Sequence, residues 1–144
     1  MTVKNNSRKM IMKDEGWSPK PYKCTEGVWT IGFGTNISRI TKEEGEMLLD
    51  LRLDKIINFD LLSFTAELPN LNDTRKIVLI NMIYQLGLHG VKRFKNMLRA
   101  IRNGDFERAS LEMLDSKWFK QTPNRCRRLA KIMKKGTINN LARV

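Results

Sequence analysis

Hydrophobic positions recur at helical spacing over most of the chain. In the C-terminal half, apolar residues three and four apart form four stretches, separated by short breaks that contain Gly, Asn or Pro. This period predicts amphipathic helices, and such breaks end them. The four predicted helices cover residues 74–86, 91–101, 106–114 and 125–135.

A longer helix is predicted before them. Thr41 is followed three residues later by Glu44, which is the spacing of a capping box at a helix start. Apolar residues at helical spacing continue to about Phe59, so we expect a helix that begins at Thr41 and runs to Phe59 or beyond. Because a helix rises about 1.5 Å per residue, one of this length could connect two lobes.

The N-terminal segment has a different pattern. Residues 3–15 mix apolar and polar positions, which is compatible with a short helix that stops at Gly16. Two prolines follow and favour an irregular or extended link. In residues 22–33, β-branched and aromatic side chains flank the turn residues 25–27, which predicts a β-hairpin. Together these elements predict an α+β fold that is predominantly helical.

Length and charge add two expectations. With 144 residues and 41% hydrophobic side chains, the chain is long enough for one compact domain, with a continuous core or two lobes. The net charge of +12 is uneven, because nine Lys or Arg and no Asp or Glu follow Asp115. Such a cationic face suits a polyanion, whether nucleic acid, an anionic membrane or the bacterial envelope. Charge by itself does not choose among these partners.

The cysteines and the histidine show no metal-site spacing. Cys24 and Cys126 lie far apart and form no C-x-x-C pair, so we expect reduced thiols, with a disulfide between them as the alternative. His89, the single histidine, has no neighbours at metal-ligand spacing. We therefore predict no metal and no cofactor. The first residues hold no apolar run of the length that a signal peptide needs, so we expect synthesis as a soluble cytoplasmic chain.

Three residues near the N-terminus carry candidate chemistry. Glu15 would lie at a helix end, Cys24 at the hairpin and Thr30 on its returning strand. Without further context, purely structural roles are the commoner interpretation: an exposed Glu, a buried Cys and a Thr on a strand. The surrounding string, D-E-G-x5-Y-K-C-T-E-G-x-W-T-I-G-x-G, resembles the active-site segment of the phage-type lysozymes, the family that includes the T-even phage enzyme.

The resemblance continues along the chain in the same order. The further matching segments are residues 81–87, Trp118, residues 121–125 and Gly136-Thr137. This resemblance implies a lysozyme-like fold with a small N-terminal lobe, a long linking helix and a helical C-terminal lobe. The single domain would span residues 1–144, with lobes at about 12–45 and 60–144 and the first helix packing on the C-terminal lobe.

Two departures from the family pattern bear on the chemistry. Cys24 stands where most members have Asp, and a Cys at this position is a minority form in related phage lysozymes. The stretch 34–41 is much shorter than its counterpart in the T-even enzyme, and Thr35 stands where that enzyme has His. We therefore expect a trimmed N-terminal lobe in which one wall of the cleft is reduced.

The resemblance also implies catalytic roles. Glycoside hydrolysis needs an acid that protonates the leaving oxygen and a second group that activates water or attacks the sugar. Glu15 is the predicted acid; burial would favour its protonated form, whereas Arg125, which the resemblance places beside it, would favour the carboxylate. As a thiolate, Cys24 could be a base toward water or a nucleophile, and Thr30 could position the water. The family's chemistry favours water activation with inversion, and retention through a thiol nucleophile is the alternative.

The same resemblance predicts a saccharide cleft. Its predicted lining residues are Tyr84, Gln85, Asn124, Arg125 and Asn36, with Met97 and Glu112 as weak candidates. For Tyr84 the alternative is a core position. Trp17, Trp29 and Trp118 are large enough to be mostly core, and Cys126 is expected to be buried and inert.

The implied function is that of an endolysin, which hydrolyses the β-1,4 bond between N-acetylmuramic acid and N-acetylglucosamine in peptidoglycan and so lyses the host. The chain would act as a monomer with no specific nucleic acid. It would need a separate pore-forming protein, a holin, to pass from the host cytoplasm to the cell wall. Two alternatives are a catalytically inactive lysozyme-fold protein that binds the wall and a basic nucleic-acid-binding protein.

Overall fold

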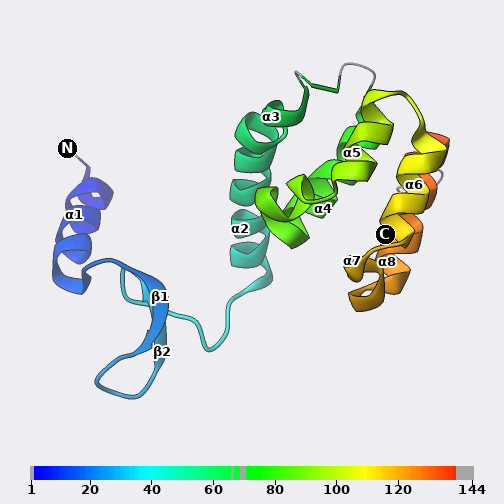
Figure 1. The fold of residues 1–144 in the computed structure, drawn as a ribbon. Helices are drawn as coiled ribbons and strands as arrows, with labels where there is room; N and C mark the ends of the chain where they lie inside the picture. Colours follow the sequence, from blue (N-terminus) through cyan, green and yellow to red (C-terminus); the bar gives the residue numbers. More distant parts are fainter. Residues whose placement is uncertain (1, 66, 69–70, 139–144) are drawn as a thin grey trace. The chain divides into compact units, whose positions relative to one another are not determined.

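The chain divides into two compact units, Met1–Leu48 and Leu49–Val144. A computed structural model describes residues 2–65, 67–68 and 71–138 (Figure 1). The boundary between the units falls inside one helix, α2 (Lys42–Lys55). The first unit holds the small sheet and the second is helical, so the predicted class, a predominantly helical α+β fold of lysozyme type, is confirmed.

The first unit begins with helix α1 (Val3–Glu15). Thr2 caps its start by accepting a hydrogen bond from the Asn5 N–H at 3.3 Å. At its end, Gly16 adopts φ +68° and donates its N–H to the Met12 carbonyl, a conformation that glycine adopts without steric cost. The helix therefore ends where the sequence predicted, with Glu15 as its last residue.

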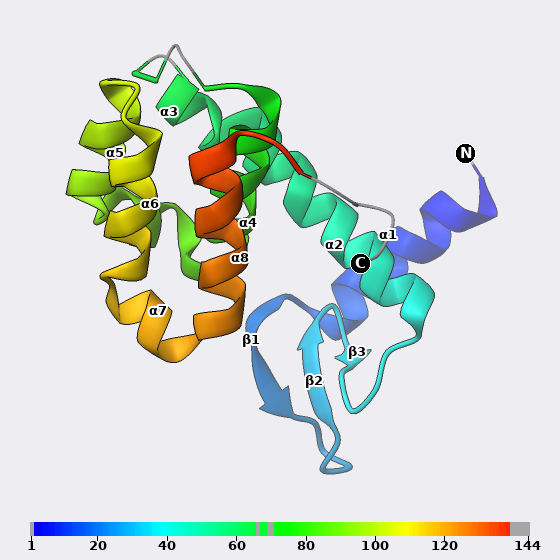
Figure 2. The ribbon, with the colours of Figure 1, turned by 90° about the vertical axis from the view of Figure 1, so that its right-hand side faces the viewer.

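Three short antiparallel strands follow in the order β1-β2-β3: β1 (Ser18–Lys23), β2 (Trp29–Gly32) and β3 (Thr35–Asn36) (Figure 2). The predicted hairpin is β1-β2, with Gly27 in its turn at φ +76°. Of the predicted irregular or extended link at Pro19 and Pro21, the extended form is the one found, because both residues lie in β1; its pairing in the sheet was not predicted. This strand is at the sheet edge and its register shifts between Ser18 and Tyr22, where missing N–H groups are tolerated.

Helix α2 begins at the predicted capping box. Thr41 donates its N–H to the Glu44 carboxylate at 2.7 Å, and its hydroxyl accepts the Glu44 N–H at 3.1 Å. After α2 the chain continues as a π-helical segment, η1 (Ile56–Asp60), and then as the short helix α3 (Leu62–Thr65). Helical backbone thus extends past Phe59, and the wider π-helical turn was not predicted.

In the described part of the second unit the further helices are α4 (Asp73–Lys92), α5 (Lys95–Arg102), α6 (Phe106–Leu114), α7 (Lys117–Gln121) and α8 (Pro123–Lys135). Gly87 interrupts α4 at φ +76°, close to the predicted break. The largest fully buried side chains are Val78, Leu79, Met82, Val91, Met97, Ile101, Met113, Cys126 and Met133. The helical C-terminal half is confirmed, and none of the described helices is long and apolar enough to cross a membrane.

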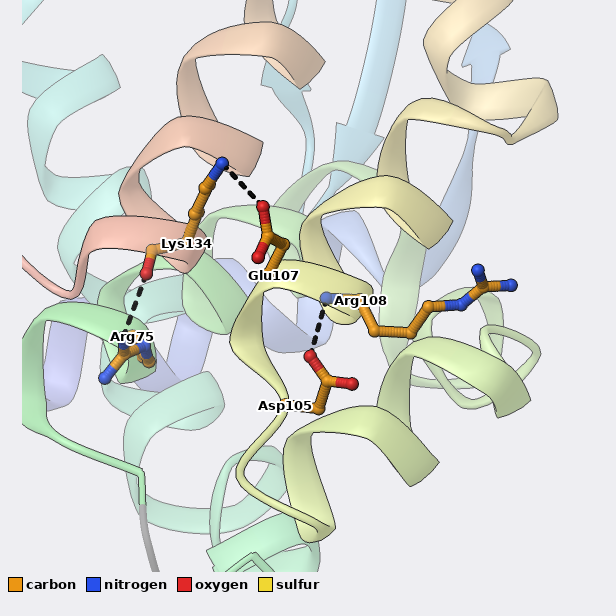
Figure 3. A network of polar contacts seen from close by, with 5 residues as sticks. All are labelled: Arg75, Asp105, Glu107, Arg108 and Lys134. Atoms are coloured by element: carbon orange, nitrogen blue, oxygen red, sulfur yellow. Dashed lines mark hydrogen bonds and ion pairs between the residues drawn. The ribbon is translucent and has the colours of Figure 1, made fainter.

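Helix α8 is anchored at its C-terminal end by Arg75 of α4. The Arg75 Nε donates to the Met133 carbonyl at 2.8 Å, and its guanidinium lies 3.5 Å from the centroid of the Phe106 ring. Figure 3 shows this guanidinium near Lys134, whose Nζ pairs with a Glu107 carboxylate oxygen at 2.9 Å. Charge-assisted hydrogen bonds to the last carbonyls of a helix stabilise that end, so α4, α6 and α8 are fixed to one another.

The two units bury their aromatic residues differently. Trp118 of α7 is 2% exposed, so its predicted core position is confirmed. The same prediction was wrong for Trp17 and Trp29, which are 65% and 50% exposed. Among the described residues of the first unit, only Thr30 is buried. So small a unit buries little of its surface, which explains why large side chains on it stay exposed.

Candidate functional site

Glu15 lies against the turn between β2 and β3. It is the last residue of α1 and is exposed to solvent. A Cβ atom added to Gly34 would lie 2.5 Å from Cδ and 2.9 Å from Cγ of Glu15, so a larger residue would displace the Glu15 side chain from this position. Gly34 also has φ +70°. The glycine therefore lets the turn approach the carboxyl group of Glu15 closely.

Cys24 and Thr30 come together at the hairpin. Cys24 precedes the turn and is half-buried, and Thr30 lies on β2 with only 5% of its surface exposed. The Cys24 sulfur accepts hydrogen bonds from the N–H groups of Val28 and Glu26, and it has a hydrogen bond with the Thr30 hydroxyl. The Cys24 N–H donates to the Val28 carbonyl at 2.9 Å, which closes the turn.

These contacts favour the thiolate form of Cys24. The N–H groups of Val28 and Glu26 lower the pKa of the thiol most strongly. Desolvation opposes them, and the Thr30 hydroxyl lowers the pKa further against a weaker effect of the Glu26 charge. Hydrogen bonds to the charged form of a group stabilise that form. The Thr30 hydroxyl also donates to the Val28 carbonyl at 3.0 Å. Because a hydroxyl has one hydrogen, Thr30 directs it either to this carbonyl or to the sulfur.

Asn36 is the next neighbour of Thr30 in the sheet. Their Cα atoms are register partners between β2 and β3, and Tyr22 is the partner of Thr30 on β1. Register partners in an antiparallel sheet share a face. The Asn36 Oδ1 accepts the Ser38 N–H at 2.9 Å, which leaves its NH2 group for another partner. The structure thus brings Cys24, Thr30 and Asn36 together on the first unit.

In the second unit, Gln85 joins α4 to α7 and α8. Its Oε1 accepts the Trp118 indole N–H at 2.9 Å, and its Nε2 donates to the Thr122 hydroxyl at 3.4 Å. Both polar atoms of the Gln85 amide therefore have partners within the unit. This side chain holds the α7–α8 junction, and its predicted contact with saccharide stays a prediction.

Arg125 is held by a residue that the sequence did not single out. Its Nε donates to the Asn81 Oδ1 at 2.8 Å, and an Nη2 donates to the Asn81 carbonyl at 3.4 Å. Asn81 lies one helical turn before Gln85, and this i, i+4 spacing is the signal that could have identified it. Asn124 beside Arg125 is exposed, and its Oδ1 accepts from Arg127 at 3.3 Å.

Two cavities of the second unit include the remaining candidates. One, of about 420 Å³, is lined by Tyr84 together with Arg52, Lys55, Ile56, Asp60, Ile83, Gly87, Leu88 and His89. Tyr84 is 45% exposed, so the alternative of a core position is wrong. The weak candidates Met97 and Glu112 line a second cavity, of about 470 Å³, which also includes Trp118.

The predicted site residues thus form two groups. The structure places Glu15, Cys24, Thr30 and Asn36 on the first unit and Tyr84, Gln85, Asn124 and Arg125 on the second. The predicted approach of Arg125 to Glu15 stays a prediction. Among residues 2–65, 67–68 and 71–138, no three His, Cys, Asp or Glu side chains gather to hold a metal ion.

The two cysteines differ in burial and in the pKa of their thiols. Both are free thiols. Cys126 is buried as predicted, where its thiol donates to the Met113 carbonyl at 3.2 Å, and burial raises its pKa to about 11. A buried thiol with a raised pKa is a poor nucleophile. Of the two, only Cys24 has the exposure and the hydrogen-bond donors that suit chemistry.

The first unit therefore combines a carboxyl group at a helix end with a thiol that is stabilised as thiolate beside a hydroxyl. This set fits a lysozyme-like hydrolase, in which one group donates a proton and another accepts one. Comparison with known proteins gives the same class. A family model described as phage lysozyme matches residues 12–135. The chain belongs to the phage lysozyme family, and its function is lysozyme-like.

Individual relatives come from several sources. The chain is 32% identical to Probable T4-type lysozyme 1 of Dictyostelium discoideum, over 90% of this chain and 94% of that protein. It is 30% identical to the Pre-baseplate central spike protein Gp5 of Enterobacteria phage T4, over 91% of this chain and 28% of that protein. It is 26% identical to an endolysin of Acyrthosiphon pisum secondary endosymbiont phage 1, over 86% of this chain and 84% of that protein.

Replacing Gly34 with Ala is expected to reduce both stability and activity. The left-handed backbone costs a residue with a Cβ about 1–2 kcal/mol, and the new methyl group overlaps the Glu15 side chain. Urea denaturation would measure the first effect and the rate of clearing of a peptidoglycan suspension the second. Gly104→Ala is the matched control, since Gly104 has φ +73° and open space around its Cβ position. Equal loss of activity in the two variants would mean that Gly34 acts through backbone strain alone.

Proposed function

We propose that this protein is an endolysin that hydrolyses the β-1,4 bond between N-acetylmuramic acid and N-acetylglucosamine in peptidoglycan. The observation that carries the proposal is the Cys24–Thr30 pair, with its lowered thiol pKa, in the same unit as Glu15. Membership in the phage lysozyme family supports peptidoglycan as the substrate.

In the proposed reaction, Glu15 protonates the glycosidic oxygen as the bond to the anomeric carbon breaks. The Cys24 thiolate accepts a proton from a water molecule that the Thr30 hydroxyl orients, and the resulting hydroxide attacks the anomeric carbon. The proton count balances, because Glu15 loses one proton and Cys24 gains one. Proton exchange with solvent then restores both groups. An attack by water from the face opposite the leaving group inverts the anomeric centre.

The second unit would contribute binding. Tyr84 and Asn124 are exposed, and an aromatic face beside amide groups fits a sugar ring. Asn81 fixes the guanidinium of Arg125, so Arg125 could present a preformed cation. The exposed Lys and Arg side chains of α8 would favour contact with the anionic envelope of bacteria. We further propose that the protein acts as a monomer, passes from the host cytoplasm to the wall through a holin-type pore, and so lyses the host.

Analysis of the new chain ends tests the proposed bond. Purified peptidoglycan is digested with the protein, the products are reduced with borohydride, and the reduced sugars are identified by mass spectrometry. We expect reduced N-acetylmuramic acid, because cleavage of this bond leaves that sugar at the reducing end. Reduced N-acetylglucosamine would instead indicate a glucosaminidase, and new amino groups without reducing ends a peptide-bond hydrolase. Tight, salt-sensitive DNA binding without any product would favour the nucleic-acid alternative.

A further inference from the structure

An exposed tryptophan lies close to the predicted acid in the sequence. Trp17 is two residues from Glu15 and keeps 65% of its surface exposed. Exposing an indole to water is unfavourable, since aromatic side chains carry large apolar surfaces. One side of the indole is supported, because its ring packs against the half-buried Phe33 with 5.0 Å between centroids and 49° between planes.

The loop that holds this indole also contacts the acid. Phe33 is flanked by Gly32 and Gly34, both with positive φ. A Cβ on Gly32 would lie 3.6 Å from the Trp17 ring, at ordinary contact distance, while a Cβ on Gly34 would overlap Glu15. Three consecutive residues therefore border the indole at one end and the carboxyl group at the other. This loop fixes the two groups at neighbouring positions.

The chemistry of an indole face suits one partner in particular. The π-system concentrates negative charge on the ring face, and the C–H groups on one face of a pyranose ring carry weak positive charge and little hydration. Such C–H contacts with an aromatic face are weak hydrogen bonds supported by apolar contact. An aromatic side chain also loses little conformational freedom on binding, since it has two rotatable bonds.

The other exposed tryptophan of this unit differs in one respect. Trp29 is 50% exposed, but the Lys23 ammonium lies 5.3 Å from its ring centroid. A cation over an indole already uses the negative potential of that face. Trp29 is also absent from the loop that contacts Glu15. The two residues therefore give a matched pair, with the same side chain in two different surroundings.

We propose that Trp17, held in place by Phe33, is a sugar-binding residue that stacks on a pyranose ring of the glycan chain next to the bond that Glu15 protonates. The inference rests on the proposed function, because the glycan is its ligand. Trp17 would form a subsite on the first unit. This subsite would recognise the apolar face of the sugar ring and not the N-acetyl or lactyl groups attached to the ring. Trp17 thus contributes binding energy and leaves proton transfer to Glu15.

The test compares Trp17→Ala, Trp17→Phe and Trp29→Ala on soluble, uncrosslinked peptidoglycan glycan strands. We expect KM to rise about five- to tenfold in Trp17→Ala, the size of a lost aromatic contact, with kcat nearly unchanged. Trp17→Phe should recover most of the affinity, and Trp29→Ala should keep the KM of the unaltered protein. Urea denaturation of each variant checks that the fold persists.

A second readout separates this inference from the proposed function. In the Glu15→Gln background, binding of chitotetraose is measured by isothermal titration calorimetry with and without Trp17→Ala. Weaker binding with Trp17→Ala supports the subsite even if the protein released no reducing sugar. An unchanged KM and unchanged chitotetraose affinity in Trp17→Ala, or an equal loss in Trp29→Ala, would overturn the inference while leaving the product analysis unaffected.

Discussion

Replacing Glu15 with Gln is expected to lower the rate of glycan cleavage by about 100- to 10,000-fold, the usual contribution of a general acid. Gln has nearly the same shape as Glu, so it should keep the contact with Gly34, but it has no acidic proton to give to the leaving oxygen. Clearing of a peptidoglycan suspension measures the rate. Cosedimentation with the same insoluble peptidoglycan measures binding, which we expect to change little.

The neighbouring carboxyl group supplies the control for this experiment. Asp14 is exposed on the last turn of α1, and the side-chain atoms nearest to Gly34 of the β2–β3 turn belong to Glu15 and not to Asp14. Asp14→Asn should therefore clear peptidoglycan at nearly the original rate. If Glu15→Gln cleared it equally fast, Glu15 would not be the acid. If both variants lost activity and binding together, the charge of the helix end would be the relevant property.

Replacing Cys24 with Ala is expected to cause a loss of similar size, about 100- to 10,000-fold, because it removes the group that accepts the second proton. Cys24→Asp should be active, since a carboxylate occupies this position in most of the family. Iodoacetamide should inhibit the unaltered protein and leave Cys24→Asp unaffected. Cys126→Ser serves as the control for alkylation, because Cys126 is buried with a raised thiol pKa. Full activity of Cys24→Ala would show that the thiol has no chemical role.

The pH dependence follows from the direction of the pKa shift. The N–H donors lower the pKa of Cys24, so its thiolate persists to lower pH than that of an ordinary cysteine. Cleavage that needs the thiolate should fall as pH decreases through this lowered pKa. In Cys24→Asp the fall should move to lower pH, because Asp ionises near a pKa of about 3.9. Alkylation rates of Cys24 against pH report the same ionisation independently. An unmoved pH profile in Cys24→Asp would contradict the thiolate's role as base.

The anomeric form of the first product separates the two possible roles of sulfur. NMR of the fresh product detects the α- or β-anomer before mutarotation. Inversion would support water activation by Cys24 and Thr30, and retention would indicate a covalent intermediate on sulfur. The close contact of Thr30 with the Cys24 sulfur fits either role, since the hydroxyl can orient a water or stabilise the thiolate.

Local signals in the sequence identified much of the fold. The Thr41–Glu44 spacing marked the start of α2, and Gly16 marked the end of α1, because both depend on hydrogen bonds within one helical turn. The strand at Pro19 and Pro21 could not be recognised in this way. An edge strand with a register shift is defined by its neighbour, whose paired residues, from Lys23↔Trp29 to Ser18↔Gly32, lie outside the range of a local sequence signal.

The sequence identified which residues belong to the candidate site, but not the contacts that those residues make. The family pattern gave Glu15, Cys24 and Thr30, and the structure supplied the N–H groups that lower the thiol pKa. The roles of Gly34, Asn81 and Trp17 were not predicted. Gly34 is important because it has no Cβ atom, and this shows only when the neighbouring Glu15 side chain is placed. Asn81 contacts Arg125, which lies 44 positions away in the sequence. Trp17 was assigned to the core because of its large side chain, but the first unit is too small to bury a side chain of that size.

The turn after Cys24 bears on how much the sequence around the thiol can vary within the family. Its sulfur is held by main-chain donors at positions 26 and 28, and every amino acid except proline supplies such a donor. Substitutions other than proline at these two positions therefore keep both donors, provided that the loop keeps its shape, and loss of the Glu26 charge would lower the thiol pKa further. Searches for related thiol-bearing enzymes should weigh the cysteine, the threonine six positions later and the length of the loop above the identity of the residues between them.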